Sequence, residues 1–313
     1  MNAASVSNTG SRPPRSRSRR APVLLACWIA SLCAVAEEST IDALQAAAEN
    51  GNADAQYEVG TAYRKGAGVP QNNETAARYL RRAADGGHAK ACADLGAFYI
   101  QGRGVKADPV EAAKLFRKGA ELNDAVAQYD LGWCLEKGQG VTRDPEEAKQ
   151  WYRAAAESNL ADAQVKMGDL YFKGLVGAER DYAMAYKWYQ RAAATGDARA
   201  QNGLGVCYEN GFGTEKNLEA AEKMFRLAAE QGDTLGQANL GEMYELGKGG
   251  LPVDLQQALL WYTLSAEQDA NLGIKSLNGL FESGKMTQEE IARGHQLAEQ
   301  YLREHPAAAG KRK

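Results

Sequence analysis

A regularly spaced set of glycines is the feature of this sequence that most constrains its fold. The spacing is 36 residues, with one interval of 37, at Gly60, Gly96, Gly132, Gly168, Gly205 and Gly241. A second glycine follows each of these by six residues, at Gly66, Gly102, Gly138, Gly174, Gly211 and Gly247. Such a period is typical of solenoids, in which stacked units together bury an apolar face that one unit cannot bury alone. The sequence therefore predicts one elongated all-α body over about 230 residues rather than two globular domains.

Each unit has the pattern of a helical hairpin, most clearly in residues 125–160. Apolar residues recur at helical spacing through Leu131 and Leu135, and Gly138 ends the run. Asp144 is then the predicted N-cap of a second helix, in which Glu147 completes a capping box. The N-caps predicted at the same place in the other units are Asn72, Asp108, Asp181, Asn217 and Asp254.

The two glycine sets predict different local structures. Glycine inside a helix costs about 1 kcal/mol relative to alanine, so we infer that the first glycine of each unit marks a close approach of its two helices. The second glycine should end the first helix in the left-handed conformation. Large residues in the middle of each second helix are expected to fill the seam between units, namely Tyr79, Leu115, Trp151, Trp188, Met224 and Trp261.

Both ends of the array depart from the repeat. Residues 37–52 are predicted to form an N-terminal capping helix, and residues 270–304 C-terminal capping helices, the last of which begins at Thr287. Residues 305–313 are small or basic, and we expect them to be disordered.

Residues 1–36 have the composition of a secretory signal peptide. Five arginines precede an apolar run over 21–36, which ends in the small residues Ala34-Val35-Ala36. We expect cleavage after about Ala36 and a periplasmic or secreted protein, or one of the endoplasmic reticulum lumen in a eukaryote. A retained anchor is a weaker alternative, because the run is shorter than the roughly 20 residues that span a bilayer. Lipid modification at Cys27 ranks lower still.

Charge and cysteine content exclude some functions. The chain has 37 basic and 40 acidic residues, and loss of the signal peptide leaves 32 basic against 40 acidic residues, a formal charge of −8. Nucleic acid is therefore not an expected partner. The three cysteines that remain, Cys92, Cys134 and Cys207, are predicted to be small buried thiols.

Two segments carry a family resemblance. Residues 55–69 read Ala-Gln-Tyr-x-x-Gly-x-x-Tyr-x-x-Gly-x-Gly-Val, and residues 148–156 read Ala-Lys-x-Trp-Tyr-x-x-Ala-Ala. They resemble the Sel-1-like repeats, a branch of the tetratricopeptide-like proteins. The resemblance implies a right-handed α-solenoid with adaptor or scaffold work, and it does not imply a reaction. It covers six units, at 53–88, 89–124, 125–160, 161–197, 198–233 and 234–269.

No pattern of catalytic or cofactor-binding residues stands out. His88, His295 and His305 are interpreted as solvated, and neither H-E-x-x-H nor paired C-x-x-C occurs. Residues 279–285 match a phosphate-loop skeleton without the following serine or threonine, and a helix end at Gly284 explains them better. We therefore predict no catalytic, metal or cofactor site.

An enzymatic role is the alternative. One branch of the resembled family is linked to β-lactam hydrolysis and carries paired cysteines in each unit, which this chain lacks. A cell-envelope hydrolase or a glycan-binding protein is therefore the second hypothesis.

A partner-binding groove is expected along the first helices. The residues one and four positions after the first glycine lie on one stripe of each helix. They provide apolar anchors at Ile100, Trp133 and Phe172 and an acidic end at Glu209, Glu242 and Glu245. Such a groove would receive an extended or helical peptide with hydrophobic and basic side chains. The competing interpretation is that Trp133 packs on the next unit and that the glutamates form a solvated surface.

Overall fold

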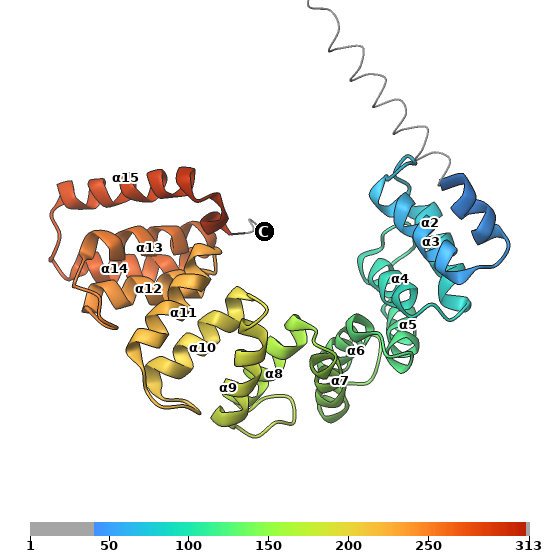
Figure 1. Ribbon diagram of the computed structural model, residues 1–313, viewed down its shortest axis with the longest axis horizontal. Coiled ribbons are helices and arrows are strands. Elements are labelled where there is room, and N and C mark those ends of the chain that lie inside the picture. The colour runs from blue at the N-terminus through green and yellow to red at the C-terminus, as the bar shows by residue number, and fades with distance from the viewer. Residues whose placement is uncertain (1–40, 311–313) are drawn as a thin grey trace, which may run out of the picture.

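The computed structural model describes residues 41–310, apart from the side chain of Ala270, and over this range it contains helices and no strand (Figure 1). Residues 41–49 are helical. The first helices of the six repeats are α2 Ala53–Lys65, α4 Ala89–Gln101, α6 Ala125–Lys137, α8 Ala161–Lys173, α10 Ala198–Asn210 and α12 Thr234–Leu246. The second helices are α3 Asn73–Asp85, α5 Pro109–Glu121, α7 Pro145–Glu157, α9 Tyr182–Ala193, α11 Leu218–Glu230 and α13 Leu255–Gln268. The predicted all-α solenoid is confirmed.

The hairpins stack side by side into a curved array. Each second helix packs on the next first helix, and first helices of neighbouring repeats also contact one another, α4 with α6, α8 with α10 and α10 with α12. In Figure 1, α6 and α8 accordingly lie on the inner side of the curve and α7 and α9 on its outer side. The first helices therefore form the concave wall.

The caps of the repeat helices confirm the predicted helix boundaries. All six predicted N-cap side chains accept a backbone N–H of the second helix that they precede. The second-set glycines all end a first helix with φ between 62° and 75°. The capping box at Glu147 is wrong, because its carboxylate instead accepts hydrogen bonds from Arg117 Nη1 of the preceding repeat at 2.7 Å and from Trp151 Nε1 at 3.1 Å.

The first-set glycines confirm the close approach of the two helices. A Cβ atom on Gly96 would lie 2.5 Å from Cε1 of Phe116, and one on Gly205 would lie 2.6 Å from the Phe225 ring. The residues that face these glycines are Leu80, Phe116, Tyr152, Tyr189, Phe225 and Tyr262. Each follows a predicted seam residue by one position. Of the predicted set, Leu115, Trp188 and Trp261 are buried, whereas Tyr79, Trp151 and Met224 are only half-buried.

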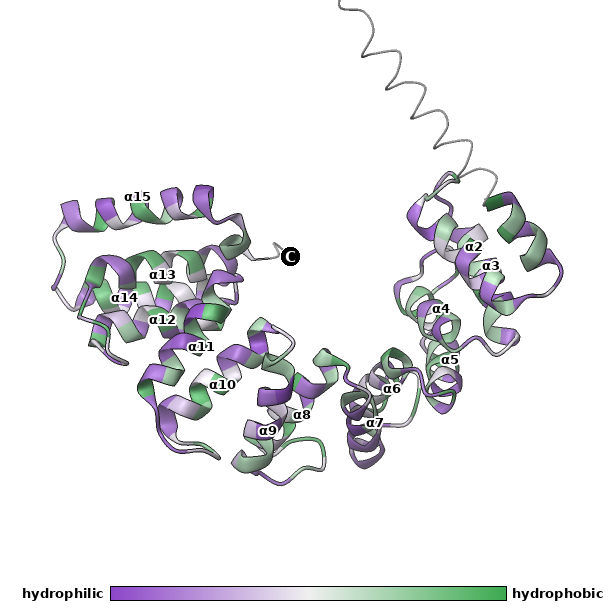
Figure 2. Ribbon diagram, in the orientation of Figure 1, coloured by the Kyte–Doolittle hydropathy of each residue, from purple (hydrophilic) through white to green (hydrophobic). Residues whose placement is uncertain are grey.

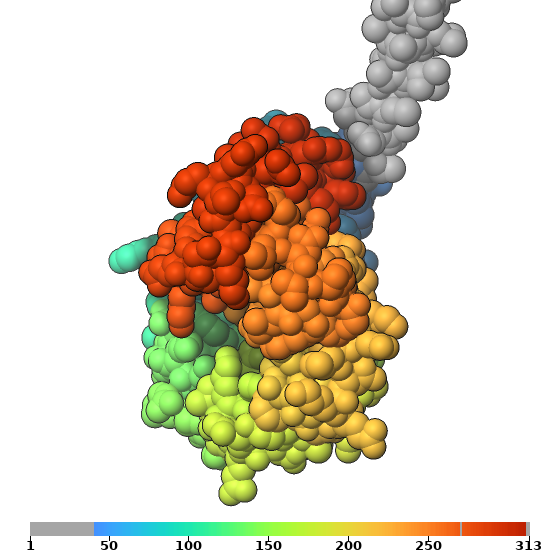
Figure 3. All heavy atoms as spheres, turned by 90° about the vertical axis from the view of Figure 1, so that its left-hand side faces the viewer, coloured from blue at the N-terminus to red at the C-terminus, as the bar shows by residue number. Residues whose placement is uncertain are grey.

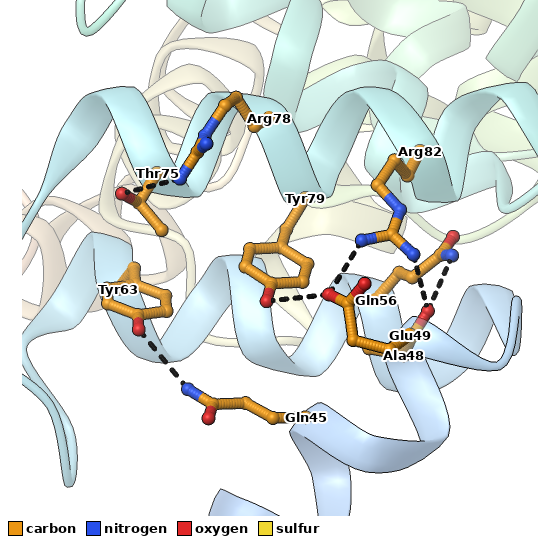
Figure 4. Close-up of polar contacts among 9 residues, drawn as sticks. All are labelled: Gln45, Ala48, Glu49, Gln56, Tyr63, Thr75, Arg78, Tyr79 and Arg82. Carbon is orange, nitrogen blue, oxygen red and sulfur yellow. Dashed lines mark hydrogen bonds and ion pairs between the residues drawn. The ribbon is translucent and has the colours of Figure 1, made fainter.

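The N-terminal helix covers the open end of the first repeat (Figure 4). The Ala48 carbonyl, near the end of this helix, accepts Gln56 Nε2 and Arg82 Nη2, each at 2.9 Å. Glu49 accepts Arg82 Nη1 at 2.8 Å and the Tyr79 hydroxyl at 3.0 Å. These contacts satisfy the Ala48 carbonyl near the helix end, and they tie the Glu49 side chain to the first repeat.

The last helices, α14 Ala270–Glu282 and α15 Gln288–Glu304, cover the other end of the stack (Figure 3). The predicted start of α15 is confirmed, with a capping box between Thr287 and Glu290. α15 packs on α13, where the rings of Trp261 and Tyr301 lie 5.1 Å apart. Most residues of α15 are exposed, and most are hydrophilic (Figure 2), as expected of the end of a solenoid. Gly284 follows α14 with φ 65°, as the helix-end interpretation of residues 279–285 requires.

The predicted disorder from residue 305 is wrong for residues 305–310. Pro306–Ala309 form a 3-10 helix, η1, in which Ala308 is fully buried. Its carbonyl accepts Gln237 Nε2 at 2.6 Å. Residues 311–313 and the predicted signal peptide lie outside the described residues. Within the described range, no helix has the length and apolar character needed to cross a membrane.

Candidate functional site

A recess on the concave wall lies between α8 and α10. Its volume is about 350 Å³, and Tyr129 of α6 and Leu235 of α12 contribute to its two ends. The first helices of four successive repeats therefore meet at this cavity.

One stripe of each first helix forms the walls. α8 contributes Asp162, Val165, Asp169 and Phe172, and α10 contributes Arg199, Asn202 and Val206, among others. Both series follow the alternating three- and four-residue steps of a single helix face. The sequence interpretation considered only positions after the glycine and so missed Val165, Arg199 and Asn202. Extending the helical period back toward the start of each helix would have found them.

The cavity has an apolar surface with little freedom to move. Val165 is 7% exposed, and Val206 is half-buried beside it. The ring of Phe172 lies 5.4 Å from that of Tyr182 and 5.7 Å from that of Phe212, edge-on to both. Such an aromatic cluster fixes its members in place. Phe172 therefore acts as a wall of the cavity rather than as a freely moving anchor.

A guanidinium held between two carboxylates lies at the rim. Arg199 Nη2 contacts Asp162 Oδ1 at 2.6 Å and Asp197 Oδ2 at 2.7 Å. The hydrogen bond to Asp197 is the main cause of a raised pKa at Arg199. Burial alone would raise the pKa of Asp197, but the hydrogen bonds from Arg199 and from the Ala200 N–H lower it overall. Arg199 and Asp197 are therefore both charged at neutral pH, and the contact of Arg199 with Asp162 links the first helices of repeats four and five.

Asp130, which follows Tyr129 on α6, is in a different electrostatic state. Burial raises its pKa to about 7, and the carboxylates of Asp124 and Asp162 add to the effect. A half-buried carboxylate whose pKa is raised in this way exchanges a proton near neutral pH.

The residues predicted for the groove lie in three places: in the cavity wall, beside the core of repeats two to four, and at the acidic end. Phe172 lines the cavity. Ile100 and Trp133 are half-buried against the core formed by repeats two to four, so they offer part of their surface to a ligand.

The predicted acidic end lies apart from the cavity. Lys248 Nζ lies 3.0 Å from Glu209 Oε1 and 2.8 Å from Glu242 Oε1, so one cation bridges two of the glutamates. Glu245 accepts the Tyr262 hydroxyl at 2.9 Å. The structure thus brings Glu209 and Glu242 together but leaves the acidic end partly neutralised.

The described thiols and histidines have structural surroundings. The three cysteines are free and buried, as predicted. Burial raises the pKa of Cys134 and of Cys207 to about 12, which disfavours the thiolate needed for nucleophilic attack. The solvated interpretation of His88 is wrong, because its Nδ1 accepts the Ala91 N–H at 3.1 Å and its ring stacks on Tyr57 at 4.3 Å. Within residues 41–310, no group of three or more His, Cys, Asp or Glu side chains could hold a metal ion.

Comparison with solved structures identifies relatives with this architecture. A Sel1 repeat protein from Oxalobacter formigenes is 34% identical, with a TM-score of 0.64 over 69% of this chain and 88% of that one. A protective antigen present in uropathogenic Escherichia coli strains, which displays an SLR fold, is 29% identical, with a TM-score of 0.59 over 86% of this chain. The chain spans 65% of the length of that antigen.

A search of curated proteins finds no match to the chain. Comparison with protein-family models agrees with the two solved structures. The family model described as Sel1 repeat matches six consecutive segments, residues 53–88, 89–124, 125–160, 161–197, 198–233 and 234–269. The chain therefore belongs to the Sel1 repeat family.

Proposed function

We propose that the protein is an exported, non-enzymatic scaffold that binds a protein or peptide partner on its concave wall. Sel1 repeat proteins are typically protein-interaction scaffolds without catalytic activity. The observation that carries the proposal is the cavity of about 350 Å³ to which four first helices contribute. A binding site made from several repeats is how solenoids use their concave surface.

The chemistry of the wall favours a partner segment with apolar and basic side chains. Val165, Val206 and Phe172 offer an apolar surface, and Leu235 is 52% exposed at one end. Asp162, Asp169 and Asp233 lie among them, beside Lys166, Lys173 and Arg199, so a basic side chain of the partner would contact this lining at its aspartates and away from its three cations. The predicted anchors Ile100 and Trp133 would extend the contact toward repeat two, and Glu209, Glu242 and Glu245 toward repeat six. An envelope signalling, regulatory or assembly role follows from export and partner binding together.

Export rests on the sequence of residues 1–36, with its basic start, apolar run and small-residue end. The formal charge of −8 left after cleavage also suits a basic partner rather than nucleic acid.

Replacing Leu235 with aspartate should weaken binding of a captured partner at least tenfold. An apolar contact would then be replaced by a carboxylate that the partner desolvates without compensation. The matched control is Leu227→Asp on α11, since Leu227 is 43% exposed and lies outside the cavity. The mature chain and both variants would be used to capture partners from the envelope extract of the source cell. Affinities would then be measured by calorimetry with the purified partner.

The double variant Trp133→Ala/Phe172→Ala tests the predicted anchors in the same assay. We expect a further loss of affinity with the helical circular dichroism spectrum retained. A partner that binds this variant and Leu235→Asp normally, but is lost by Leu227→Asp, would place the binding surface on the convex side and refute the proposal.

A further inference from the structure

A nearly buried asparagine opens onto the cavity between α8 and α10. Asn202 of α10 is 8% exposed and belongs to the lining of the cavity. Its Oδ1 accepts a hydrogen bond from Asn239 Nδ2 of α12 at 2.7 Å, which fixes the orientation of the Asn202 amide. No described residue accepts a hydrogen bond from Asn202 Nδ2, and this atom is not among the enclosed polar atoms that lack a partner. The free N–H group of Asn202 therefore faces the cavity.

This donor requires a hydrogen-bond acceptor from the ligand. A buried donor without a partner costs free energy, so a ligand that fills the cavity must bring a carbonyl or another acceptor oxygen to Asn202. In the middle of an α-helix, every main-chain carbonyl already accepts the N–H four residues further on. An extended segment leaves its main-chain carbonyls free. The asparagine therefore favours an extended partner segment over a helical one.

The residue next to Asn202 makes room for a side chain of the partner. Gly203 lines the cavity, and a Cβ atom there would lie 2.8 Å from Cε1 of the Tyr189 ring, whose hydroxyl donates to Asp169 Oδ1 at 2.6 Å. The other five repeats have larger residues at this place, namely Glu58, Asp94, Asp130, Lys166 and Asn239. At about 350 Å³ the cavity is near the small end of ligand pockets. It therefore suits one large apolar side chain, which Gly203 admits because it has none of its own.

The N-terminal ends of the first helices add a charge preference. Arg199 pairs with both Asp162 and Asp197, so its charge is balanced within the protein. Asp233 accepts the Gly236 N–H at 2.7 Å and forms no ion pair with any described residue. Burial and the Asp197 carboxylate raise the pKa of Asp233, an effect that a cation beside it would offset. A basic side chain of the partner is therefore favoured at Asp233.

The lysines of the lining do not oppose this placement. Lys166 Nζ lies 2.7 Å from Glu136 Oε2 and is already paired. Lys173 is the last residue of α8, about 16 Å along the helix from Asp162 near its start. The acidic end of the cavity and its exposed lysine are therefore separate.

We propose that the cavity binds an extended partner segment through three contacts. One large apolar side chain enters beside Gly203, a main-chain carbonyl accepts a hydrogen bond from Asn202 Nδ2, and a neighbouring basic side chain lies at Asp233. This assignment rests on the proposed function and specifies the kind of segment that the scaffold receives. Asn202 thereby determines specificity, because it selects extended over helical segments.

A capped dipeptide tests the three contacts without the natural partner. The probe is N-acetyl-leucyl-lysine methylamide, added at millimolar concentration to the purified, isotope-labelled protein. We expect the NMR signals of the Asn202 side-chain amide to shift as the dipeptide binds. Binding elsewhere, or no shift of these signals, would show that the proposal is wrong.

Asn202→Asp removes the donor and keeps the shape of the side chain. Its carboxylate can still accept from Asn239 Nδ2, so the contact between the two helices remains. Dipeptide binding should weaken about three- to tenfold, as expected for the loss of one hydrogen bond. The added negative charge alone would strengthen binding of a basic peptide, so a loss cannot come from charge.

Asn210→Asp is the matched control for this variant, because Asn210 is exposed on the same helix and lies outside the cavity. It should bind the dipeptide as the wild type does. Asn202→Leu, which has neither donor nor acceptor, should show the same loss as Asn202→Asp. Wild-type affinity in both Asn202 variants would contradict the hydrogen bond.

Two further comparisons test the side-chain contacts. Val206→Trp should fill the cavity and abolish binding, whereas Ala97→Trp, at the same place in repeat two and outside the cavity, should not. The dipeptide with glutamate in place of lysine should bind at least about threefold more weakly. Retained binding to Val206→Trp would exclude the apolar contact, and equal affinity of the two dipeptides would exclude the basic contact at Asp233.

The captured partner separates this assignment from the proposed function. If Leu235→Asp weakens partner binding and Asn202→Asp does not, the scaffold function stands and the extended mode of binding is wrong. If both variants bind the partner normally, the concave wall is not the binding surface and both proposals fail.

Discussion

Replacing Gly140 with alanine should lower the free energy of unfolding by about 3–5 kcal/mol, the combined cost of a strained backbone and an overpacked contact. Gly140 has φ 74°, in the left-handed region, and a Cβ atom there would overlap the carbonyl of Pro109. Pro109 begins α5, the second helix of the preceding repeat. The variant should therefore separate two neighbouring repeats as well as strain one loop.

Gly68→Ala is the matched control for this prediction. Gly68 occupies the same place in the first repeat with φ 69°, but a Cβ atom there would meet nothing within 4 Å. Its replacement should cost only about 1–2 kcal/mol, from the left-handed backbone alone. Guanidinium unfolding followed by circular dichroism measures both. Equal losses would show that the loop contact between repeats contributes nothing to stability.

Replacing Asp130 with asparagine should stabilise the protein at pH 8 by about 2–4 kcal/mol and change little at pH 4. The pKa of Asp130 is raised from 3.8 to about 7 in the folded state, mainly by burial. Well below pH 3.8 the carboxyl is neutral in both states and costs nothing. As pH rises from about 4 to 7 the unfolded state ionises first, so the wild-type protein loses stability until the folded-state pKa is passed. Asparagine avoids this loss because it carries no charge.

Unfolding curves of the wild type and Asp130→Asn at pH 4, 6 and 8 show whether the stability difference between the two proteins grows with pH. Glu179→Gln is the control, because Glu179 is exposed on the loop between α8 and α9 and its replacement should have a small effect throughout. A stability difference between wild type and Asp130→Asn that does not grow between pH 4 and pH 8 would contradict the raised pKa of the carboxyl.

Features that depend on neighbours along the chain were predictable. The N-cap side chain of Asp144 and the left-handed Gly138 each act within one turn of their own helix, so residue type and position were sufficient. The recurrence of Gly132 predicted a close helix approach, because glycine within a helix needs a compensating contact. The residue that supplies this contact, Tyr152 rather than Trp151, was missed. The two differ by a turn of about 100° around the helix, and the crossing of the two helices decides which one faces the glycine.

The groove could be predicted only in outline. That the first helices form the concave wall follows from hairpin stacking, and Phe172 was correctly placed on it. The position of the cavity depends on how far repeats four and five rotate relative to each other, which no single repeat encodes. The ion pair between Asp162 and Arg199 also joins residues 37 positions apart. In the sequence, Asp162 and Arg199 each have the pattern of an ordinary surface charge.

The sequence by itself determined the repeat, the hairpin, the helix ends and the family, because each of these depends on residue types at fixed short spacings. Only the tertiary structure decided where the concave wall is hollowed, which carboxylate has its pKa raised and where the segment after α15 lies. After His305 that segment contains only proline, alanine and glycine through Gly310, so it has no apolar period to predict its burial. Its order comes from a buried glutamine and a close glycine contact in repeats five and six, which become neighbours of this segment only after the solenoid has folded.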